Sequence, residues 1–241
     1  DVFVEIDYMV GAGHTHLPAK SALDSVARAF RDAAPRPSVV AAGLCAANAP
    51  RGACPINVHF DVGPNYQPTV SEASCANAST WTPACAIVRT SAGTKGGDPI
   101  PEALSTDPAR RAFPGYAGVV GWKNGLRAYR DQLVNATTRV ACTTPDQPGC
   151  EPRFPYQRKD IFRYVLFAHA LGLPAPRDPL SPDAPPRPRK TSGVADSGGG
   201  DALVTLGLWD DQTGSPFVQG ATLMHELGHT FGLRHGGVTA S

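Results

Sequence analysis

Charged residues are scarce in this sequence, and it contains no long apolar run. Only 18% of the 241 residues are Asp, Glu, Lys or Arg, and the formal net charge is +1. So small a net charge creates no strong field that would attract nucleic acid or an anionic membrane surface. Because no apolar run approaches the ~20 residues that a membrane-spanning helix needs, we expect no transmembrane segment and no membrane partner.

Glycine and proline are abundant instead, with 25 and 24 residues, and hydrophobic residues make up 41% of the chain. This composition is typical of a loop-rich globular protein, since a disordered chain has too few apolar residues to form a core. The length fits one domain, which we take to span residues 1–241. Proline and glycine concentrate in 174–200, where we expect a loop.

Cysteine never occurs at CxxC spacing, so a cysteine zinc site or a redox motif is not expected. The six cysteines form three pairs that are close in sequence: Cys45 and Cys54, Cys75 and Cys85, Cys142 and Cys150. Proximity favours these pairings, although six cysteines allow about 15 connectivities. Disulfides indicate an oxidising compartment, and we expect a secreted protein, extracellular or periplasmic. Asp1 lies directly before an expected strand, as after removal of a signal or propeptide.

Hydrophobic periodicity predicts alternating strands and helices. The expected strands are 2–7, 56–62, 161–171 and 202–208, and the expected helices are 21–34, 122–140 and a last one that includes 223–231. The segment 64–155 holds four of the cysteines and few apolar runs. We interpret it as a disulfide-stapled insertion beside a sheet.

The most informative stretch is HELGHTFGLRH, which begins at His225 and ends at His235. His225 and His229 are four residues apart, so on a helix their Cβ atoms lie roughly 5–6 Å apart on one face. Both imidazoles can then reach one Zn²⁺ at about 2.0–2.1 Å. Gly232 can end the helix, which lets His235 approach the same ion. Three nitrogen ligands leave one coordination position open, as in catalytic zinc sites.

Glu226 lies about 100° round the helix from His225, where it suits a general base. The opposite face is apolar, with Leu223, Leu227 and Phe231 at helical spacing and Met224 beside them. A helix with two surface histidines is the simpler interpretation. Five fixed positions and the amphipathic pattern favour zinc.

This stretch resembles the HExxHxxGxxH signature of the metzincin clan of zinc metalloendopeptidases. The resemblance implies that His225, His229 and His235 are zinc ligands, Glu226 the general base and Gly232 the turn. It also implies an α/β fold of the α+β type: a twisted, mixed and mostly parallel sheet with a backing helix and an active-site helix. Looser matches to secreted bacterial-type members occur at 1–7, 58–63, 161–169 and 191–195.

Metzincins also have a C-terminal subdomain with a methionine in a tight turn beneath the metal. This sequence ends six residues after His235, and both of its methionines, Met9 and Met224, come earlier. We therefore expect the C-terminal subdomain to lie largely outside this chain. Gly236 after the third histidine matches none of the residues that mark well-known subfamilies, so no subfamily is assigned.

The resemblance implies a secreted zinc endopeptidase that acts on proteins or peptides, with Glu226 as general base for the attacking water. We expect a monomer that does not bind nucleic acid. One alternative is a non-catalytic zinc-containing module for binding or adhesion. Another is a zinc hydrolase with a non-protein substrate, which the extended signature disfavours.

Other polar residues are weaker candidates. His14 and His16 could ligate a second metal, but their glycine-containing segment favours a solvated loop. His169 is expected to be a hydrogen-bonded core or edge histidine. Four carboxylates could bind Ca²⁺, but their spacing fits no EF-hand, which favours solvated side chains: Asp196, Asp201, Asp210 and Asp211.

Overall fold

The structure, a computed structural model, describes residues 1–33, 43, 55–68, 70–76, 79–88, 94–102, 116–173 and 187–236. Its strands are β1 (Val2–Gly11), β2 (His14–Thr15), β3 (Val58–Asp61), β4 (Pro99–Pro101), β5 (Val119–Gly121), β6 (Leu133–Asn135), β7 (Cys150–Pro152), β8 (Phe162–Ala168), β9 (Ala170–Leu173), β10 (Arg187–Arg189), β11 (Gly193–Ala195) and β12 (Asp201–Thr205). Its helices are α1 (Lys20–Arg31), α3 (Glu72–Ala76), α4 (Asn124–Arg130) and α5 (Pro216–Thr230), with short 3₁₀ turns at Pro83–Ala86, Tyr156–Arg158 and Asp210–Gln212.

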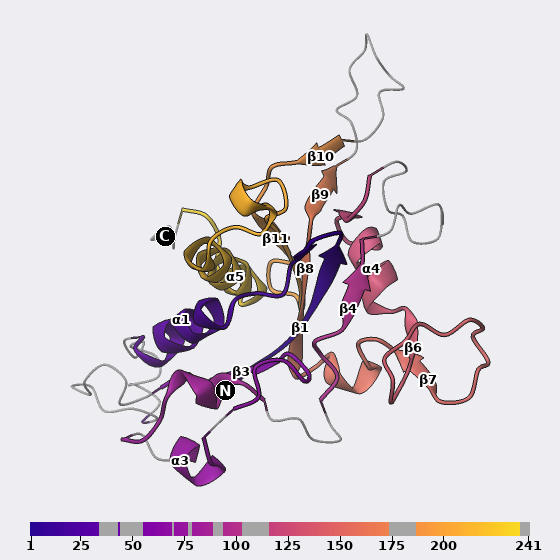
Figure 1. Cartoon of the computed structure of the whole chain (residues 1–241). Coiled ribbons are helices and arrows are strands. Elements are labelled where there is room, and N and C mark those ends of the chain that lie inside the picture. Colours follow the sequence, from indigo (N-terminus) through magenta and orange to yellow (C-terminus); the bar gives the residue numbers. More distant parts are fainter. Residues whose placement is uncertain are drawn as a thin grey trace.

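A mixed sheet lies at the centre of the molecule (Figure 1). Within the described residues it has seven strands, five of them in the order β11-β12-β8-β1-β2. β3 and β4 pair one after the other with the edge of β1 that faces away from β8. β1, β3, β4, β8 and β12 run parallel, whereas β2 and β11 are antiparallel to their neighbours. The expected mixed α/β architecture is confirmed at this level.

Side chains alternate between the two faces of the sheet along each strand, and both faces are buried in a hydrophobic core. In β8, Val165 and Phe167 pack toward α1 and α5, whereas Tyr164 and Leu166 pack toward α4. Figure 1 shows α1 and α5 together on one side of the sheet and α4 on the other. The continuous apolar run expected for a doubly covered strand thus corresponds to β8.

Several predicted elements are confirmed. The strands expected at 2–7 and 202–208 correspond to β1 and β12, and the helix expected at 21–34 corresponds to α1. The strand expected at 161–171 is divided into β8 and β9 around His169. The last helix is α5, which carries the HELGH residues in its second half.

The helix expected at 122–140 is wrong in its second half. α4 ends at Arg130, and Leu133–Asn135 forms β6, which pairs antiparallel with β7. The apolar residues that fitted a helical period are divided between two elements. Leu126 belongs to α4 and lies in the core, whereas Val134 is buried in the β6–β7 pair.

Two segments expected to lie outside the sheets contribute strands to them. β4, within 64–155, pairs with β1 in the main sheet, and β5 pairs with β9 in a smaller one. Within 174–200, β10 pairs with β9 and β11 extends the main sheet beyond β12. The part of that expected loop from 174 to 186 lies outside the described residues.

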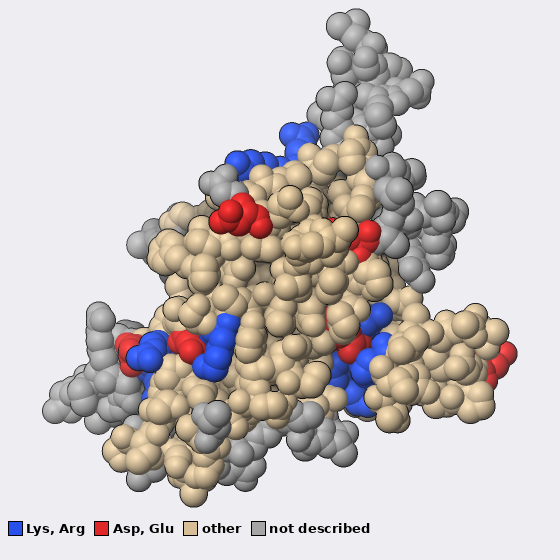
Figure 2. Space-filling view, in the orientation of Figure 1, with Lys and Arg blue, Asp and Glu red and all other residues tan. Residues whose placement is uncertain are grey.

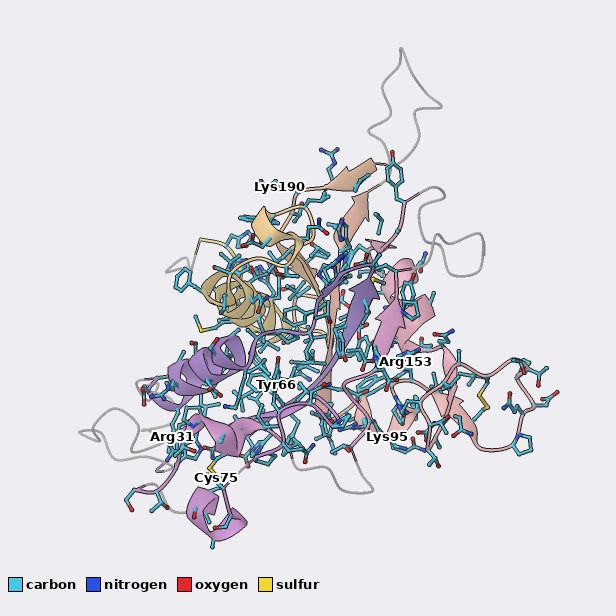
Figure 3. All side chains as sticks on the ribbon, viewed as in Figure 1. Arg31, Tyr66, Cys75, Lys95, Arg153 and Lys190 are labelled. Carbon is cyan, nitrogen blue, oxygen red and sulfur yellow. A yellow bond between two sulfur atoms is a disulfide. The ribbon has the colours of Figure 1, made fainter. Side chains whose placement is uncertain are left out.

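Two of the three expected disulfides are present, Cys75–Cys85 and Cys142–Cys150 (Figure 3). Each closes a short loop, with sequence separations of 10 and 8 residues. Cys45 and Cys54 lie outside the described residues. The two bonds are compatible with an extracellular protein.

Charged side chains are sparse on the face in Figure 2, where the described residues show small groups of mixed sign rather than one continuous basic surface. This agrees with the low charged fraction of the sequence. None of the helices in the described residues has the length and apolar character that crossing a membrane requires.

Candidate metal centre

The start of α5 is fixed by a cap and by a contact with α1. Ser215 caps the helix, because its side-chain oxygen accepts a hydrogen bond from the backbone N–H of Val218 at 3.4 Å, and Pro216 occupies the first turn. The side-chain oxygen of Gln219 accepts a hydrogen bond from the backbone N–H of Ala19 at 2.8 Å. The helix is therefore held to the residue that precedes α1.

The end of α5 is a glycine-dependent turn. Gly232 has a φ of 83°, a left-handed conformation that glycine adopts at low cost. The backbone N–H groups of Gly232 and Leu233 donate to the carbonyl oxygens of His229 and Gly228 at 2.8 and 3.0 Å. This is the hydrogen-bond pattern of a Schellman motif, and it reverses the chain so that His235 returns toward the helix.

The core side of α5 fixes the helix against the sheet and α1. Leu223 and Leu227 are fully buried, as their spacing predicted. Phe231 is 39% exposed but packs edge-on against Phe30 of α1, with ring centroids 6.2 Å apart. Met224, beside this stripe, is 43% exposed. The apolar stripe thus holds the opposite, histidine-bearing face toward the solvent.

Three imidazoles converge on that face. The Nε2 atoms of His225 and His229 are 3.1 Å apart, and the Nε2 atom of His235 lies 3.0 Å from each of them. The helix supplies two rings from successive turns, and the turn at Gly232 supplies the third. The structure therefore brings together all three histidines that the sequence singled out as ligands.

This arrangement passes a test of fit for a zinc ion. Three imidazole nitrogens so close together suit one ion that binds imidazoles at about 2.0–2.1 Å. The Nδ1 atom of His229 lies 2.7 Å from the carbonyl oxygen of Leu233, so it can donate a hydrogen bond and leave Nε2 with a free lone pair. Partial burial, and then charge on the other two rings, lowers the pKa of His225, which favours a neutral ring.

Glu226 is placed differently from the histidines. Its side chain is only 3% exposed, and among the described residues its Oε2 atom has no hydrogen-bond partner. Burial raises the pKa of this carboxyl to about 7, although charge on His229 opposes the shift. Glu226 is therefore a buried carboxyl beside three converging imidazoles, in a state between acid and base near neutral pH.

A cleft of about 540 Å³ lies between this group and the edge strand β11. Its lining residues come from β11, the loops beside it and the histidine-bearing face: Thr191, Ser192, Gly193, Val194, Ala195, Ser197, His225, Glu226, His229, Arg234 and His235. An edge strand can pair with an extended peptide backbone. The cleft thus places such an edge directly beside Glu226 and the three rings.

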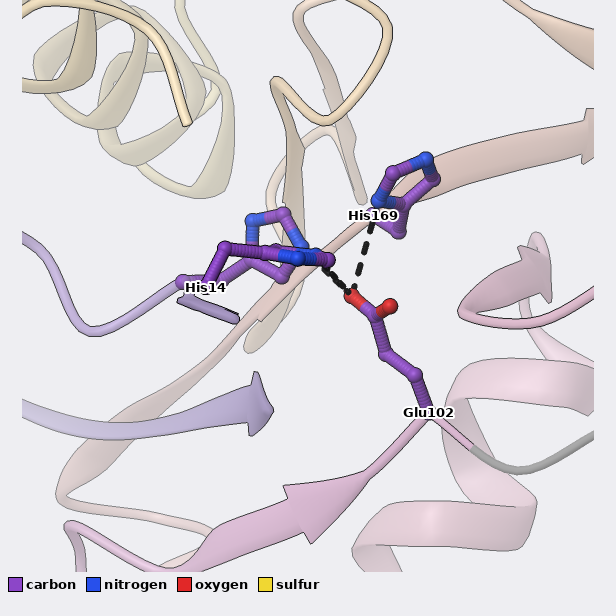
Figure 4. A group of neighbouring side chains, drawn as sticks. His14, Glu102 and His169 are labelled. Carbon is purple, nitrogen blue, oxygen red and sulfur yellow. Dashed lines mark hydrogen bonds and ion pairs between the residues drawn. The ribbon is translucent and has the colours of Figure 1, made fainter. Parts of the chain in front are cut away.

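A second group of potential ligands lies at a distinct place, at the carboxyl ends of β1, β4 and β8: His14, His16, Glu102 and His169 (Figure 4). The solvated loop expected around His14 and His16 is wrong, because His16 is only 3% exposed. His169, the residue that follows β8, lies beside these two histidines. Sequence reasoning missed Glu102, which belongs to no motif; the only available signal was that parallel strands end at a common edge.

The aspartates considered for calcium have other partners. Asp196 forms an ion pair with Lys123 at 3.0 Å, and Asp201 forms one with Arg130 at 2.6 Å. Neither belongs to the groups of three or more potential ligands in the described part of the chain. The solvated side chain expected for Asp201 is wrong, because Asp201 is only 6% exposed and is ion-paired, whereas Asp196 is partly exposed.

The described residues thus contain two groups of side chains that could hold a metal ion. Comparison with protein-family models finds no match to this chain. Searches of curated proteins and of solved structures likewise find no significantly similar protein.

Proposed function

We propose that this chain is a secreted zinc endopeptidase, with His225, His229 and His235 as ligands and Glu226 as general base. The observation that carries the proposal is the convergence of three Nε2 atoms, each 3.0–3.1 Å from the others, beside a buried carboxyl group. The resemblance of this stretch to the metzincin signature supports the same assignment.

The chain's residues supply binding, orientation and proton transfer. The outer edge of β11 pairs with the backbone of an extended substrate and places a peptide bond over the cleft. The Oε2 atom of Glu226, buried and without a partner among the described residues, accepts the proton of the attacking water and returns it to the leaving amine. When bound, zinc supplies Lewis-acid chemistry: it makes water more acidic and polarises the scissile carbonyl.

Several observations support a peptide as substrate and an oxidising compartment as location. The cleft is open along a strand edge, a shape that suits an extended chain. The two disulfides support secretion, outside the cell or into a periplasm.

The direct test is Glu226→Gln, which keeps the size of the side chain but removes the base. We expect casein hydrolysis to fall by about 10²-fold or more, because a positioned base contributes that much. Zinc content, measured by mass spectrometry on the purified chain, should not change. A matched control is Glu151→Gln on β7, which removes a carboxylate paired with Lys95 and should leave hydrolysis unaltered.

A chelator and His225→Ala complete the test. Each should abolish hydrolysis, and His225→Ala should lower the zinc content. If Glu226→Gln cleaves casein at the parent rate, the proposed base is wrong. If the parent chain binds zinc but cleaves neither casein nor unfolded peptides, the chain is a non-catalytic zinc-containing binding module.

A further inference from the structure

The second histidine group joins parts of the chain that are far apart in sequence. His14 is in β2 and His16 follows it, Glu102 follows β4, and His169 lies between β8 and β9. Since β4 and β8 both run parallel to β1, their carboxyl ends meet at one edge of the sheet. Figure 4 shows His14 and His169 pointing toward the carboxylate of Glu102.

One carboxylate oxygen has too many ring neighbours for an ordinary hydrogen-bond network. The Oε1 atom of Glu102 lies 2.6 Å from Nε2 of His16, 3.2 Å from Nε2 of His14 and 3.5 Å from Nδ1 of His169. A carboxylate oxygen has about two lone-pair directions, so it cannot accept well from three rings. The buried Nδ1 atom of His169 accordingly has no hydrogen-bond partner in the described residues. An unpaired buried nitrogen that faces two imidazoles and a carboxylate indicates a missing cationic partner.

Three glycines lie directly against this group. The histidine and glutamate side chains occupy the space that a Cβ atom at each glycine would need. A Cβ atom at Gly11 would clash with the ring of His14 and with Glu102. A Cβ at Gly118, whose φ is 65°, would clash with His169, and one at Gly207 would clash with the same ring. Gly11 ends β1, Gly118 directly precedes β5, and Gly207 lies two residues after the end of β12. Side chains and backbone can therefore pack closely around one small centre.

We propose that His14, His16, Glu102 and His169 bind a second divalent transition-metal ion, separate from the one at His225. Three imidazole nitrogens and one carboxylate oxygen form a donor set that zinc binds in tetrahedral geometry. The four ligand atoms all lie within 4.8 Å of one another, and the four side chains are between 3% and 21% exposed.

Four protein ligands complete a tetrahedral shell, which is typical of structural rather than catalytic sites. The ion therefore has a mechanical role. It ties the β1–β2 hairpin to the end of β4 and to the junction of β8 and β9, so that three segments share one cross-link. Because the unfolded chain does not hold these ligands together, the free energy of binding stabilises the fold.

The test examines this site in a variant that lacks the three histidines of the other site, His225, His229 and His235. In a chain of residues 1–241 carrying His225→Ala, His229→Ala and His235→Ala, we expect one equivalent of zinc to remain after dialysis against metal-free buffer. Adding Glu102→Gln or His169→Asn should remove it, or weaken zinc binding by more than about 100-fold, since even an outer-shell partner contributes 10–100-fold. Zinc titration should also raise the melting temperature of the triple His→Ala variant. It should not raise the melting temperature once Glu102→Gln or His169→Asn is added.

A matched control is His59→Asn in the same background, because His59 is a partly exposed histidine on β3 that stacks on Phe3 outside the group. It should retain the equivalent of zinc. Circular dichroism without metal checks that every variant is folded, and Co²⁺ in place of zinc gives an absorption spectrum that reports tetrahedral nitrogen and oxygen ligands. The proposal is overturned if the variant lacking the first site holds no zinc while folded, or if Glu102→Gln and His169→Asn leave its zinc affinity unchanged.

Discussion

At the scale of single residues, the position of Glu226 depends on a neighbour that has no side chain. Gly193 in β11 lies so close that a Cβ atom there would be 2.7 Å from Oε1 of Glu226 and 2.8 Å from its Cγ. The same Cβ would be 2.8 Å from the backbone oxygen of Leu203, so it could not move away freely. A glycine at this position lets the edge strand approach the proposed base.

Gly193→Ala should therefore displace the carboxylate of Glu226. We expect kcat/KM for casein to fall by about 10²-fold, since a misplacement near 1 Å can cost that much, while zinc content stays constant. The matched control is Gly200→Ala, where an added Cβ has no heavy atom within 4 Å. Equal activity of the two variants would show that Glu226 does not need the position that this structure gives it.

The convergence of the three histidine rings could be predicted from sequence, because local spacing determines it. His225 and His229 share one helix, and Gly232 ends it, so their convergence with His235 followed from local rules. His16 and Glu102 are separated by 86 positions in the sequence and meet only because two parallel strands end at one edge. No local pattern contains that information, because it depends on strand order.

At the scale of elements, α5 is the part on which the first site depends. Leu227 follows Glu226 directly and is fully buried between the sheet and α1, whereas Met224 on the same helix is 43% exposed. The helix thus presents the proposed base and ligands on one side because its other side is anchored in the core.

Leu227→Ala should lower the free energy of unfolding by about 2–5 kcal/mol, through lost burial and the cavity that remains. Met224→Ala should change it by no more than about 0.5 kcal/mol, because alanine is also a good helix former and the site is at the surface. Urea unfolding followed by circular dichroism measures both. Similar losses in the two variants would contradict the arrangement of α5 in the core.

Element prediction failed in 122–140 for a tertiary reason. Leu133 and Val134 fit a helical period with Leu126, but they lie in β6 and pair with β7 instead. The Cys142–Cys150 disulfide closes part of the loop that connects β6 to β7. Pairing partners that are distant in sequence outweigh helical periodicity over a short segment. Long, strongly patterned elements such as β1, α1 and α5 were predicted correctly because local pattern and tertiary packing agree there.

At the scale of the whole molecule, a layer of buried charge lies on the α4 side of the sheet. It joins carboxylates of β1 and β3 and of the residues before β4 to guanidinium groups of the segment between α4 and β8: Glu5, Asp7, Asp61 and Asp98 with Arg139, Arg153 and Arg158. Figure 3 marks Arg153, which is paired with Asp98. Four buried carboxylates thus face three arginines.

Asp7 is the carboxylate of this layer that has no arginine in direct contact in the described residues. Its oxygens accept hydrogen bonds from the backbone N–H of Asp98 at 2.9 Å and from the hydroxyl of Tyr164 at 3.0 Å. Complete burial, and then the charge of Asp98, raises the pKa of Asp7 to about 7, despite the opposing attraction of Arg153 and these two hydrogen bonds. The ordinary value is 3.8.

Because the pKa of Asp7 is higher in the folded state than in the unfolded state, the folded chain binds this proton more strongly. The resulting stabilisation is complete below about pH 4 and is lost as the pH rises to about 7, which is the reverse of an ion-paired carboxylate.

Asp7→Asn removes the titration but keeps an acceptor for the backbone N–H of Asp98. From pH 4 to pH 8, the free energy of unfolding of the parent should fall relative to Asp7→Asn by up to about 4 kcal/mol. Urea unfolding of both chains across this range measures the difference, and Asp160→Asn, at an exposed position, corrects for the lost charge. A difference that stays flat or grows with pH would mean that Asp7 is ionised throughout, and that the buried layer is balanced by its arginines.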